Sequence, residues 1–196
     1  MRIAGGTYSG RLIQAPKGPG IRPTLDQVRQ ALFNLLGERV AGAKVLDLFS
    51  GSGALGIEAL SRGAAHVTFV DRSGFCVRAI AENLKSIGVE PSRCQVIRSE
   101  AVAAIRRLEG RSFDGVLLDP PYGADLAIKS LNALSRYAIV ASSGWVVAEH
   151  DKRDSLPPLT EGKEARLVLQ RQERYGDTVL SIYEKSPHTG HLSGDV

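Results

Sequence analysis

The sequence predicts an α/β fold built on a doubly wound, mostly parallel, seven-stranded sheet. First, apolar strand-type segments alternate with helix-type segments between residues 44 and 150, a pattern typical of a parallel sheet covered by helices on both faces. Second, a glycine-rich turn follows the first of these strands. Third, the last two strand-type segments flank Gly176-Asp177, a strong hairpin signal. Five parallel strands and an antiparallel pair make up the predicted sheet.

The elements follow from hydrophobic periodicity. A first helix begins at Thr24 as N-cap and carries apolar residues at helical spacing as far as Leu36, with Arg29 off the apolar stripe and free to face a ligand or solvent. The predicted strands are residues 44–49, 66–71, 94–99, 113–119, 144–150, 167–175 and 178–185. The predicted later helices are residues 54–62, 73–87, 101–108 and 126–137.

The two ends of the chain differ from this regular pattern. Residues 1–16 read as a small hairpin around a glycine-rich turn, so residues 1–20 are expected to form a basic arm. Residues 21–186 then form the main domain. Residues 187–196 lack periodicity and are expected to be a disordered tail.

Charge is concentrated at the amino-terminal end. The net charge is +4, and residues 1–30 hold five basic residues against Asp26 alone. Clustered basic side chains displace counterions from phosphates, so the arm indicates a polyanionic partner. The alternative is a merely solvated basic terminus.

Several classes of protein are disfavoured. No apolar run approaches the roughly 20 residues of a membrane span, and the start has no signal-peptide core, so we expect no membrane association and a cytoplasmic location. Cys76 and Cys94 lack CxxC spacing, and the histidines form no metal-binding pattern. We therefore expect neither a disulfide scaffold nor a metal site.

The glycine turn points to a nucleotide-like cofactor. Gly51, Gly53 and Gly56 match GxGxxG, which allows close backbone approach to a ligand but is equally typical of dinucleotide-binding folds. Asp47 favours a cofactor that has a cationic amino-acid portion and no phosphate. A carboxylate beside the turn would repel a pyrophosphate, whereas it would attract a cationic group. Asp71 ends the second strand, where a carboxylate can bind ribose hydroxyls.

The segment Asp119-Pro120-Pro121-Tyr122 lies at the carboxyl end of the fourth strand, the edge at which open α/β sheets bind ligands. The two prolines fix the backbone and expose carbonyl oxygens. The Asp119 carboxylate and the Pro120 carbonyl can accept both N–H bonds of an exocyclic amine and direct its lone pair at a methyl donor. Tyr122 offers a flat face for stacking an extruded base.

These motifs resemble those of known enzymes. The stretch LDLFSGSGALGIEAL resembles the cofactor loop of class I methyltransferases, which have a Rossmann-like fold, and DPPY resembles the (D/N)PP(Y/F/W) signature of amino-group methyltransferases. The amino-terminal stretch resembles the start of the bacterial 16S ribosomal RNA guanine-N2 methyltransferase family known as RsmD. The matching residues there are Arg2, Ile3, Gly5, Gly6, Gly10, Arg11, Arg22, Pro23, Thr24, Asp26, Val28, Arg29, Phe33 and Asn34.

The resemblance implies methylation of a single guanine N2 in 16S rRNA within an assembled small ribosomal subunit, with S-adenosylmethionine as cofactor. We also expect the enzyme to be a monomer. The implied catalytic residues are Asp119, Pro120 and Tyr122. The implied cofactor-binding residues are Asp47, Phe49, Gly51, Gly53, Asp71, Arg72, Glu100 and Ala101. The implied RNA-binding residues are Arg2, Arg11, Arg22, Thr24 and Arg29.

Several alternatives remain open at this point. An adenine-N6 methyltransferase acting on RNA or DNA would share every catalytic residue. A nicotinamide-dependent oxidoreductase would explain the glycine turn, but neither Asp47 nor DPPY. A non-catalytic RNA-binding module would retain the motifs as a relic pocket. Ser99-Glu100 can lie at the adenine end of the cofactor or simply cap a helix.

Overall fold

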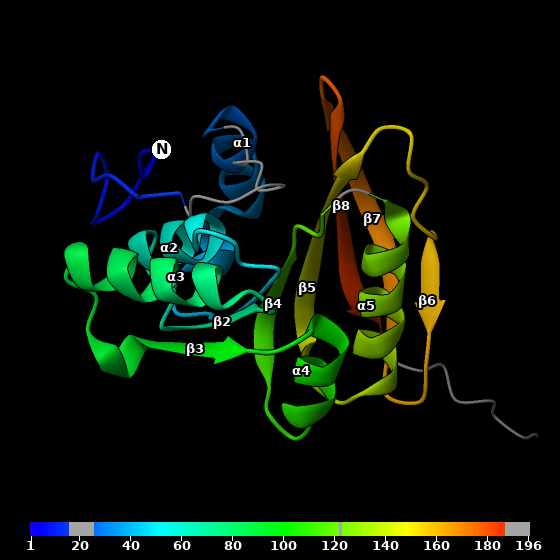
Figure 1. Ribbon diagram of the computed structural model, residues 1–196. Coiled ribbons are helices and arrows are strands. Elements are labelled where there is room, and N and C mark those ends of the chain that lie inside the picture. Colours follow the sequence, from blue (N-terminus) through cyan, green and yellow to red (C-terminus); the bar gives the residue numbers. More distant parts are fainter. Residues whose placement is uncertain (16–25, 122, 187–196) are drawn as a thin grey trace, which may run out of the picture.

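The computed structural model describes residues 1–15, 26–121 and 123–186 and contains one eight-stranded mixed sheet in the order β3-β2-β1-β4-β5-β8-β7-β6 (Figure 1). The strands are β1 (Lys44–Leu48), β2 (His66–Asp71), β3 (Cys94–Arg98), β4 (Phe113–Leu118), β5 (Val140–Asp151), β6 (Leu159–Glu161), β7 (Arg166–Tyr175) and β8 (Thr178–Ser186). The first five strands pair in parallel, and the last three join in antiparallel fashion.

Helices cover both faces of this sheet. The helices are α1 (Asp26–Leu36), α2 (Ala54–Ser61), α3 (Gly74–Ser86), α4 (Ala101–Arg107) and α5 (Ala124–Arg136), with short 3-10 turns at Gly37–Val40 and Pro91–Arg93. One core joins α1, α2 and α3 to side chains such as Val45 of β1, and the other joins α4 and α5 to side chains such as Leu46. Because neighbouring strand residues point to opposite faces, β1 contributes to both cores. The predicted doubly wound α/β class is confirmed.

The sheet differs from the prediction in one strand. β6 is an eighth, three-residue edge strand that pairs Leu159 with Val168 of β7. It follows Pro157 and Pro158 and is too short to show a period of its own, so the sequence does not reveal it. The hairpin between β7 and β8 is as predicted, with Gly176 at φ 64°.

The amino-terminal segment folds back on itself and packs against the domain (Figure 1). An isolated antiparallel bridge pairs Arg2 with Leu12, and Ile3 and Ile13 are each 2% exposed in the core that α1, α2 and α3 share. The predicted boundary near residue 20 and the predicted tail at 187–196 both lie outside the described residues, so the domain division remains a prediction.

Candidate active site

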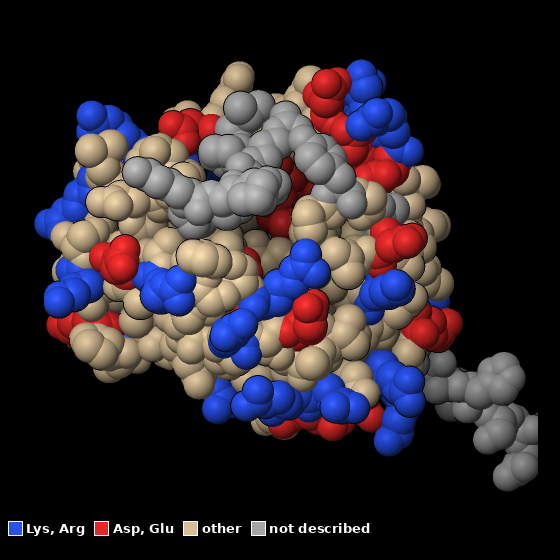
Figure 2. All heavy atoms as spheres, in the orientation of Figure 1, with Lys and Arg blue, Asp and Glu red and all other residues tan. Residues whose placement is uncertain are grey.

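Three carboxyl groups gather at the carboxyl edge of the parallel strands. Asp47 lies in β1, Asp71 ends β2, and Asp119 directly follows β4. Register places Asp47 between Phe69 of β2 and Leu117 of β4, so the three groups share one end of the sheet. Figure 2 shows a hollow at this edge with acidic side chains in its floor. The site is therefore built to receive a positively charged ligand group.

Asp47 lies beneath the glycine turn. It is 1% exposed, and its Oδ2 accepts a hydrogen bond of 2.9 Å from the backbone N–H of Gly56. Burial, together with the nearby charges of Asp119 and Asp71, raises the pKa of Asp47 from 3.8 to about 8, although the Gly56 hydrogen bond lowers it. Asp47 thus supports the turn from below, and its predicted contact with a cofactor remains a prediction.

Asp47→Asn is expected to remove a pH dependence from the stability of the fold. Between the unfolded pKa of 3.8 and the folded pKa of about 8, the folded chain holds a proton that the unfolded chain has released. The contribution of Asp47 to the free energy of unfolding therefore falls with rising pH in this window, by up to about 1.4 kcal/mol per pH unit. Urea unfolding at several pH values measures this slope.

The matched control is Asp114→Asn, because Asp114 is exposed at the amino end of β4. The control should keep the wild-type slope. A stability difference between Asp47→Asn and the wild type that stays constant from pH 4 to pH 8 would contradict the raised pKa of Asp47.

The turn after β1 is strained and firmly held. Phe49 has a φ of 64°, which is unfavourable for a residue with a side chain, and Gly51 and Gly53 follow at 56° and 82°. The Ser50 hydroxyl donates to the Asp47 carbonyl at 2.7 Å and accepts from the Val70 N–H at 2.9 Å. Ser50 thereby joins the ends of β1 and β2. These bonds fix the conformation of the glycine turn that a cofactor would contact.

Asp71 connects this turn to the next helix. Its Oδ2 accepts from the Gly51 N–H at 2.9 Å, and its Oδ1 accepts from the Ser73 N–H at 2.8 Å. Each carboxylate oxygen has two lone pairs, so Asp71 retains capacity to accept a ribose hydroxyl. Asp71 therefore positions the glycine turn, and its predicted role toward ribose is compatible with these bonds.

Arg72 and Glu100 lie on the rim of the site. Their side chains are 68% and 65% exposed, and Arg72 Nη1 lies 4.0 Å from Glu100 Oε1. Glu100 precedes α4 but makes no side-chain capping bond, and the Ser99 hydroxyl bonds the Glu100 carbonyl instead. Glu100 is therefore the N-cap residue of α4 by position, in keeping with the helix-cap alternative, although no side-chain hydrogen bond caps the helix. Ala101, the first residue of α4, is buried.

The DPPY segment begins where β4 ends, as predicted. Asp119 and Pro120 are both half-buried at this edge, so both are partly accessible to a ligand. Tyr122 of this segment and Arg22 and Thr24 of the predicted RNA-binding set lie outside the described residues.

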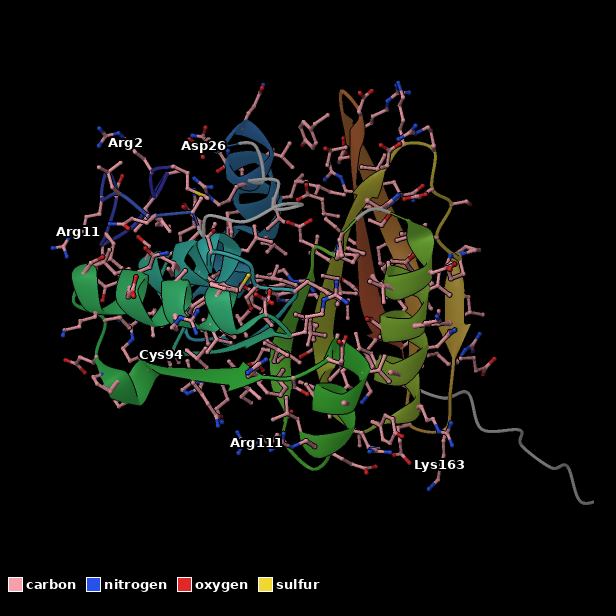
Figure 3. All side chains as sticks on the ribbon, viewed as in Figure 1. Arg2, Arg11, Asp26, Cys94, Arg111 and Lys163 are labelled. Atoms are coloured by element: carbon pink, nitrogen blue, oxygen red, sulfur yellow. The ribbon has the colours of Figure 1, made fainter. Side chains whose placement is uncertain are left out.

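The arginines of the amino-terminal segment are partly engaged within the protein. Arg2 Nη1 donates to the Gly10 carbonyl at 2.9 Å, and Arg11 donates to the Ile87 carbonyl at the end of α3 and lies over the Tyr8 ring. Figure 3 shows Arg2 and Arg11 on the outer side of this segment. Both side chains retain further N–H donors for a phosphate.

The prediction that Arg29 faces a ligand or solvent is wrong. Arg29 is 0% exposed and donates to Asp26 Oδ1 at 2.9 Å and to the Arg2 carbonyl, while its Nε lies 3.5 Å from Glu58 Oε2. A buried guanidinium is tolerated when carboxylates and carbonyls surround it. Arg29 therefore anchors the amino-terminal segment and is unavailable to RNA.

Sequence reasoning missed several buried polar residues that hold this segment, among them Glu58 and Asn83. Glu58 of α2 is 0% exposed and accepts from the backbone N–H groups of Ala4 at 2.8 Å and Gly5 at 2.9 Å. A carboxylate in the otherwise mostly apolar helix ALGIEALS was the available signal.

Asn83 of α3 is the second of these residues. It is 2% exposed, accepts from the Gln14 N–H at 2.9 Å, and donates to the carbonyls of Gln14 at 3.0 Å and Ser52 at 2.9 Å. Ser52 belongs to the glycine turn, so Asn83 ties the amino-terminal segment to the turn directly.

Two further properties of the described residues bear on function. Among the described residues, no helix is both long and apolar enough to cross a membrane. Within the same part of the chain, no group of three or more histidine, cysteine or acidic residues has a geometry that could hold a metal ion.

Comparisons with known proteins identify close similarities. The family model described as conserved hypothetical protein 95 matches residues 1–184. The Bacillus subtilis protein named "Putative rRNA methyltransferase YlbH" is 40% identical over 187 residues, covering 94% of this chain and 99% of the relative. Ribosomal RNA small subunit methyltransferase D of Escherichia coli K12 is 32% identical over 185 residues, covering 94% of this chain and 90% of the relative. The solved structure of Escherichia coli YhhF superposes with a TM-score of 0.81 at 29% identity, covering 94% and 97% of the two chains.

Proposed function

The chain belongs to the conserved hypothetical protein 95 family, the RsmD family of methyltransferases, and from this premise we propose that it methylates the N2 amino group of a guanine in small-subunit rRNA with S-adenosylmethionine as the methyl donor. Two relatives that align over nearly the whole chain carry rRNA methyltransferase names. The proposal assigns rRNA, the substrate class in these names, to this chain and adds guanine N2 as the methyl acceptor.

The observation that carries the proposal is the gathering of Asp47, Asp71 and Asp119 beside a strained glycine turn. Burial is the main cause of the raised pKa of Asp47, and the charges of Asp119 and Asp71 contribute to it, so these two carboxylates give the site its negative field. Such an acidic site repels a pyrophosphate and attracts the sulfonium and ammonium groups of S-adenosylmethionine. The same field argues against a nicotinamide dinucleotide.

The residues of the turn fit this cofactor. Gly51 and Gly53 adopt positive φ, which lets the backbone approach a ligand closely. Asp71 would bind the ribose hydroxyls, and Arg72, Glu100 and Ala101 are the proposed contacts of the adenine end. Phe49 sets the direction of the turn, and Asp47 holds it from below.

Bound S-adenosylmethionine supplies an electrophilic methyl group. The Asp119 carboxylate and the Pro120 carbonyl would accept the two N–H bonds of the guanine amine, and this holds the nitrogen lone pair toward that methyl group. Positive charge would develop on the nitrogen as the nitrogen–methyl bond forms and the sulfur–methyl bond breaks, and the Asp119 carboxylate would stabilise it until the surplus proton passes to water. Tyr122 would stack on the extruded base. Arg2, Arg11, Arg22 and Thr24 are the proposed RNA contacts.

The test is transfer of tritiated methyl from S-adenosylmethionine to small ribosomal subunits, naked rRNA and duplex DNA taken from a strain that lacks this gene. We expect label on small-subunit rRNA, recovered as N2-methylguanine by nucleoside mass spectrometry. Label recovered as N6-methyladenine would support the adenine alternative and overturn the proposed acceptor. A wild-type protein that labels none of the three would favour the binding-module alternative.

A further inference from the structure

Phe75 is an exposed aromatic residue that the fold does not use. It lies in the first turn of α3 and is 67% exposed, whereas the buried face of that helix carries Cys76, Ile80, Asn83 and Leu84. A phenylalanine in solvent contributes nothing to the core, and large exposed apolar groups often mark binding surfaces. Its position, four residues after Asp71, places it beside the site described above.

One arginine lies over this ring, and Arg72 and Arg98 lie next to the first turn of α3. The guanidinium carbon of Arg78 lies 4.7 Å from the ring centroid of Phe75. Arg98, at the end of β3, donates from Nε to the Arg72 carbonyl at 3.3 Å, and its guanidinium carbon lies 3.5 Å from the position that a Cβ on Gly74 would take. Arg72, Arg78 and Arg98 are all exposed, and Figure 2 shows basic side chains on the same face as the hollow.

Charge favours a nucleic acid over an apolar protein partner. Two acidic residues lie beside these arginines. Glu100 Oε1 is 4.0 Å from Arg72 Nη1 and its side chain is 65% exposed, while Asp71 precedes Arg72 and pairs in register with Arg98. Three arginines against two carboxylates leave a net positive charge next to the Phe75 ring. Unpaired nucleotides are recognised by this combination, since their bases stack on aromatic rings and guanidinium planes while basic groups contact the phosphates.

We propose that Phe75, Arg78 and Arg98 form a stacking platform that binds an unpaired nucleotide of the RNA substrate next to the target base. One face of the Phe75 ring meets Arg78, and the exposed remainder offers a surface to a base. The platform deepens the proposed function and rests on RNA being the substrate. It holds a neighbour of the target, because the target itself belongs at Asp119.

The first experiment uses fluorescence. Phe75→Trp places an exposed indole on the platform, whereas the natural Trp145 is 1% exposed and gives a constant background. Oligoadenylate should quench the new emission, since adenine stacks strongly, and an RNA duplex should quench it much less. The wild-type protein should show neither change. Absence of quenching by oligoadenylate would overturn the platform.

The second experiment compares affinities for small ribosomal subunits. Phe75→Ala and Phe75→Leu should each weaken binding about tenfold, a loss within the range measured for one base–aromatic stack. Phe75→Trp keeps an aromatic ring and should retain the wild-type affinity. Leu159→Ala is the matched control, because Leu159 is an exposed apolar residue (38%) on the far edge strand. Wild-type affinity in Phe75→Leu would indicate a simple apolar contact with protein and sink the proposal.

Arg78→Gln and Arg98→Gln test whether these two arginines of the platform contact RNA phosphates. Each should reduce the slope of log affinity against log salt by about 0.7 if it contacts one phosphate of a single strand. Cofactor affinity, measured in parallel, should be unchanged in Phe75→Ala. An equal loss of cofactor and RNA affinity would mean that Phe75 stacks on the cofactor adenine and would overturn the assignment.

These outcomes separate the platform from the proposed function. Methyl transfer by the wild type without quenching in Phe75→Trp would refute the platform and leave the function standing. Quenching in Phe75→Trp without methyl transfer by the wild type would refute the function and leave the platform as an RNA contact.

Discussion

Asp119→Ala is expected to reduce methyl transfer by at least about a hundredfold while cofactor binding stays largely intact. The proposed role of Asp119 is to accept an amine N–H and to stabilise the charge that develops on nitrogen. Removing one preorganised group of this kind from an active site costs on the order of a hundred- to a thousandfold in kcat. Single-turnover transfer to small subunits measures the chemistry, and calorimetry with S-adenosylhomocysteine measures the cofactor site.

Two variants sharpen this prediction. Asp119→Asn keeps an acceptor oxygen and loses the charge, so its activity should fall between the wild type and Asp119→Ala. Asp114→Ala removes an aspartate from the other end of the same strand, where its carboxylate accepts from the Lys44 N–H at 2.8 Å, and should leave transfer unchanged. Near-wild-type activity of Asp119→Ala would refute the assigned role.

Glu58→Ala is expected to produce the largest loss of stability. Glu58 is 0% exposed, accepts from Ala4, Gly5 and Arg62, and lies beside the fully buried Arg29. Its removal leaves the buried Arg29 with Asp26 as its remaining carboxylate partner and leaves the amides of Ala4 and Gly5 without their acceptor, which typically costs about 3–5 kcal/mol. For a chain of this size the melting temperature should fall by about 10 °C. Thermal and urea unfolding measure this loss.

The control for this prediction is another glutamate in an ion pair. Glu184 lies 2.8 Å from Arg39, but the two side chains are 44% and 39% exposed, so Glu184→Ala should cost less than about 1 kcal/mol. Amide hydrogen exchange at Ala4 and Gly5 should accelerate in Glu58→Ala alone. Equal losses in the two variants would show that the buried network is not what holds the amino-terminal segment.

Most of the fold could be predicted from local sequence patterns. The alternation of apolar segments predicted seven strands that the structure contains, because periodicity reports which face of an element is buried. β6 was missed because three residues show no period, and it is the pairing of Leu159–Glu161 with β7 that makes this segment a strand. β5 begins at Val140, before the predicted residue 144, because Val140 pairs with Phe113 of β4 ahead of the point where the register shifts.

Part of the candidate site could likewise be predicted from the sequence, and part could not. The position of the glycine turn after β1 and of Asp119 after β4 followed from sequence order, since parallel strands bring their carboxyl ends to one edge. The burial of Arg29 did not follow. Its helical position off the apolar stripe suggested exposure. Only the ion pairs of its guanidinium with the carboxylates of Glu58 and Asp26 make burial favourable.

The sequence by itself determined the α/β class, the order of the elements and the edge of the sheet at which the motifs meet, because these depend on local periodicity and chain direction. The tertiary structure decided which charges are buried and what they bond. It raised the pKa of Asp47 to about 8, enclosed Arg29 with Glu58, tied the amino-terminal segment to the glycine turn through Asn83, and left Phe75 exposed among arginines. Desolvation and pairing depend on groups far apart in the chain, so they exist only once those groups pack together.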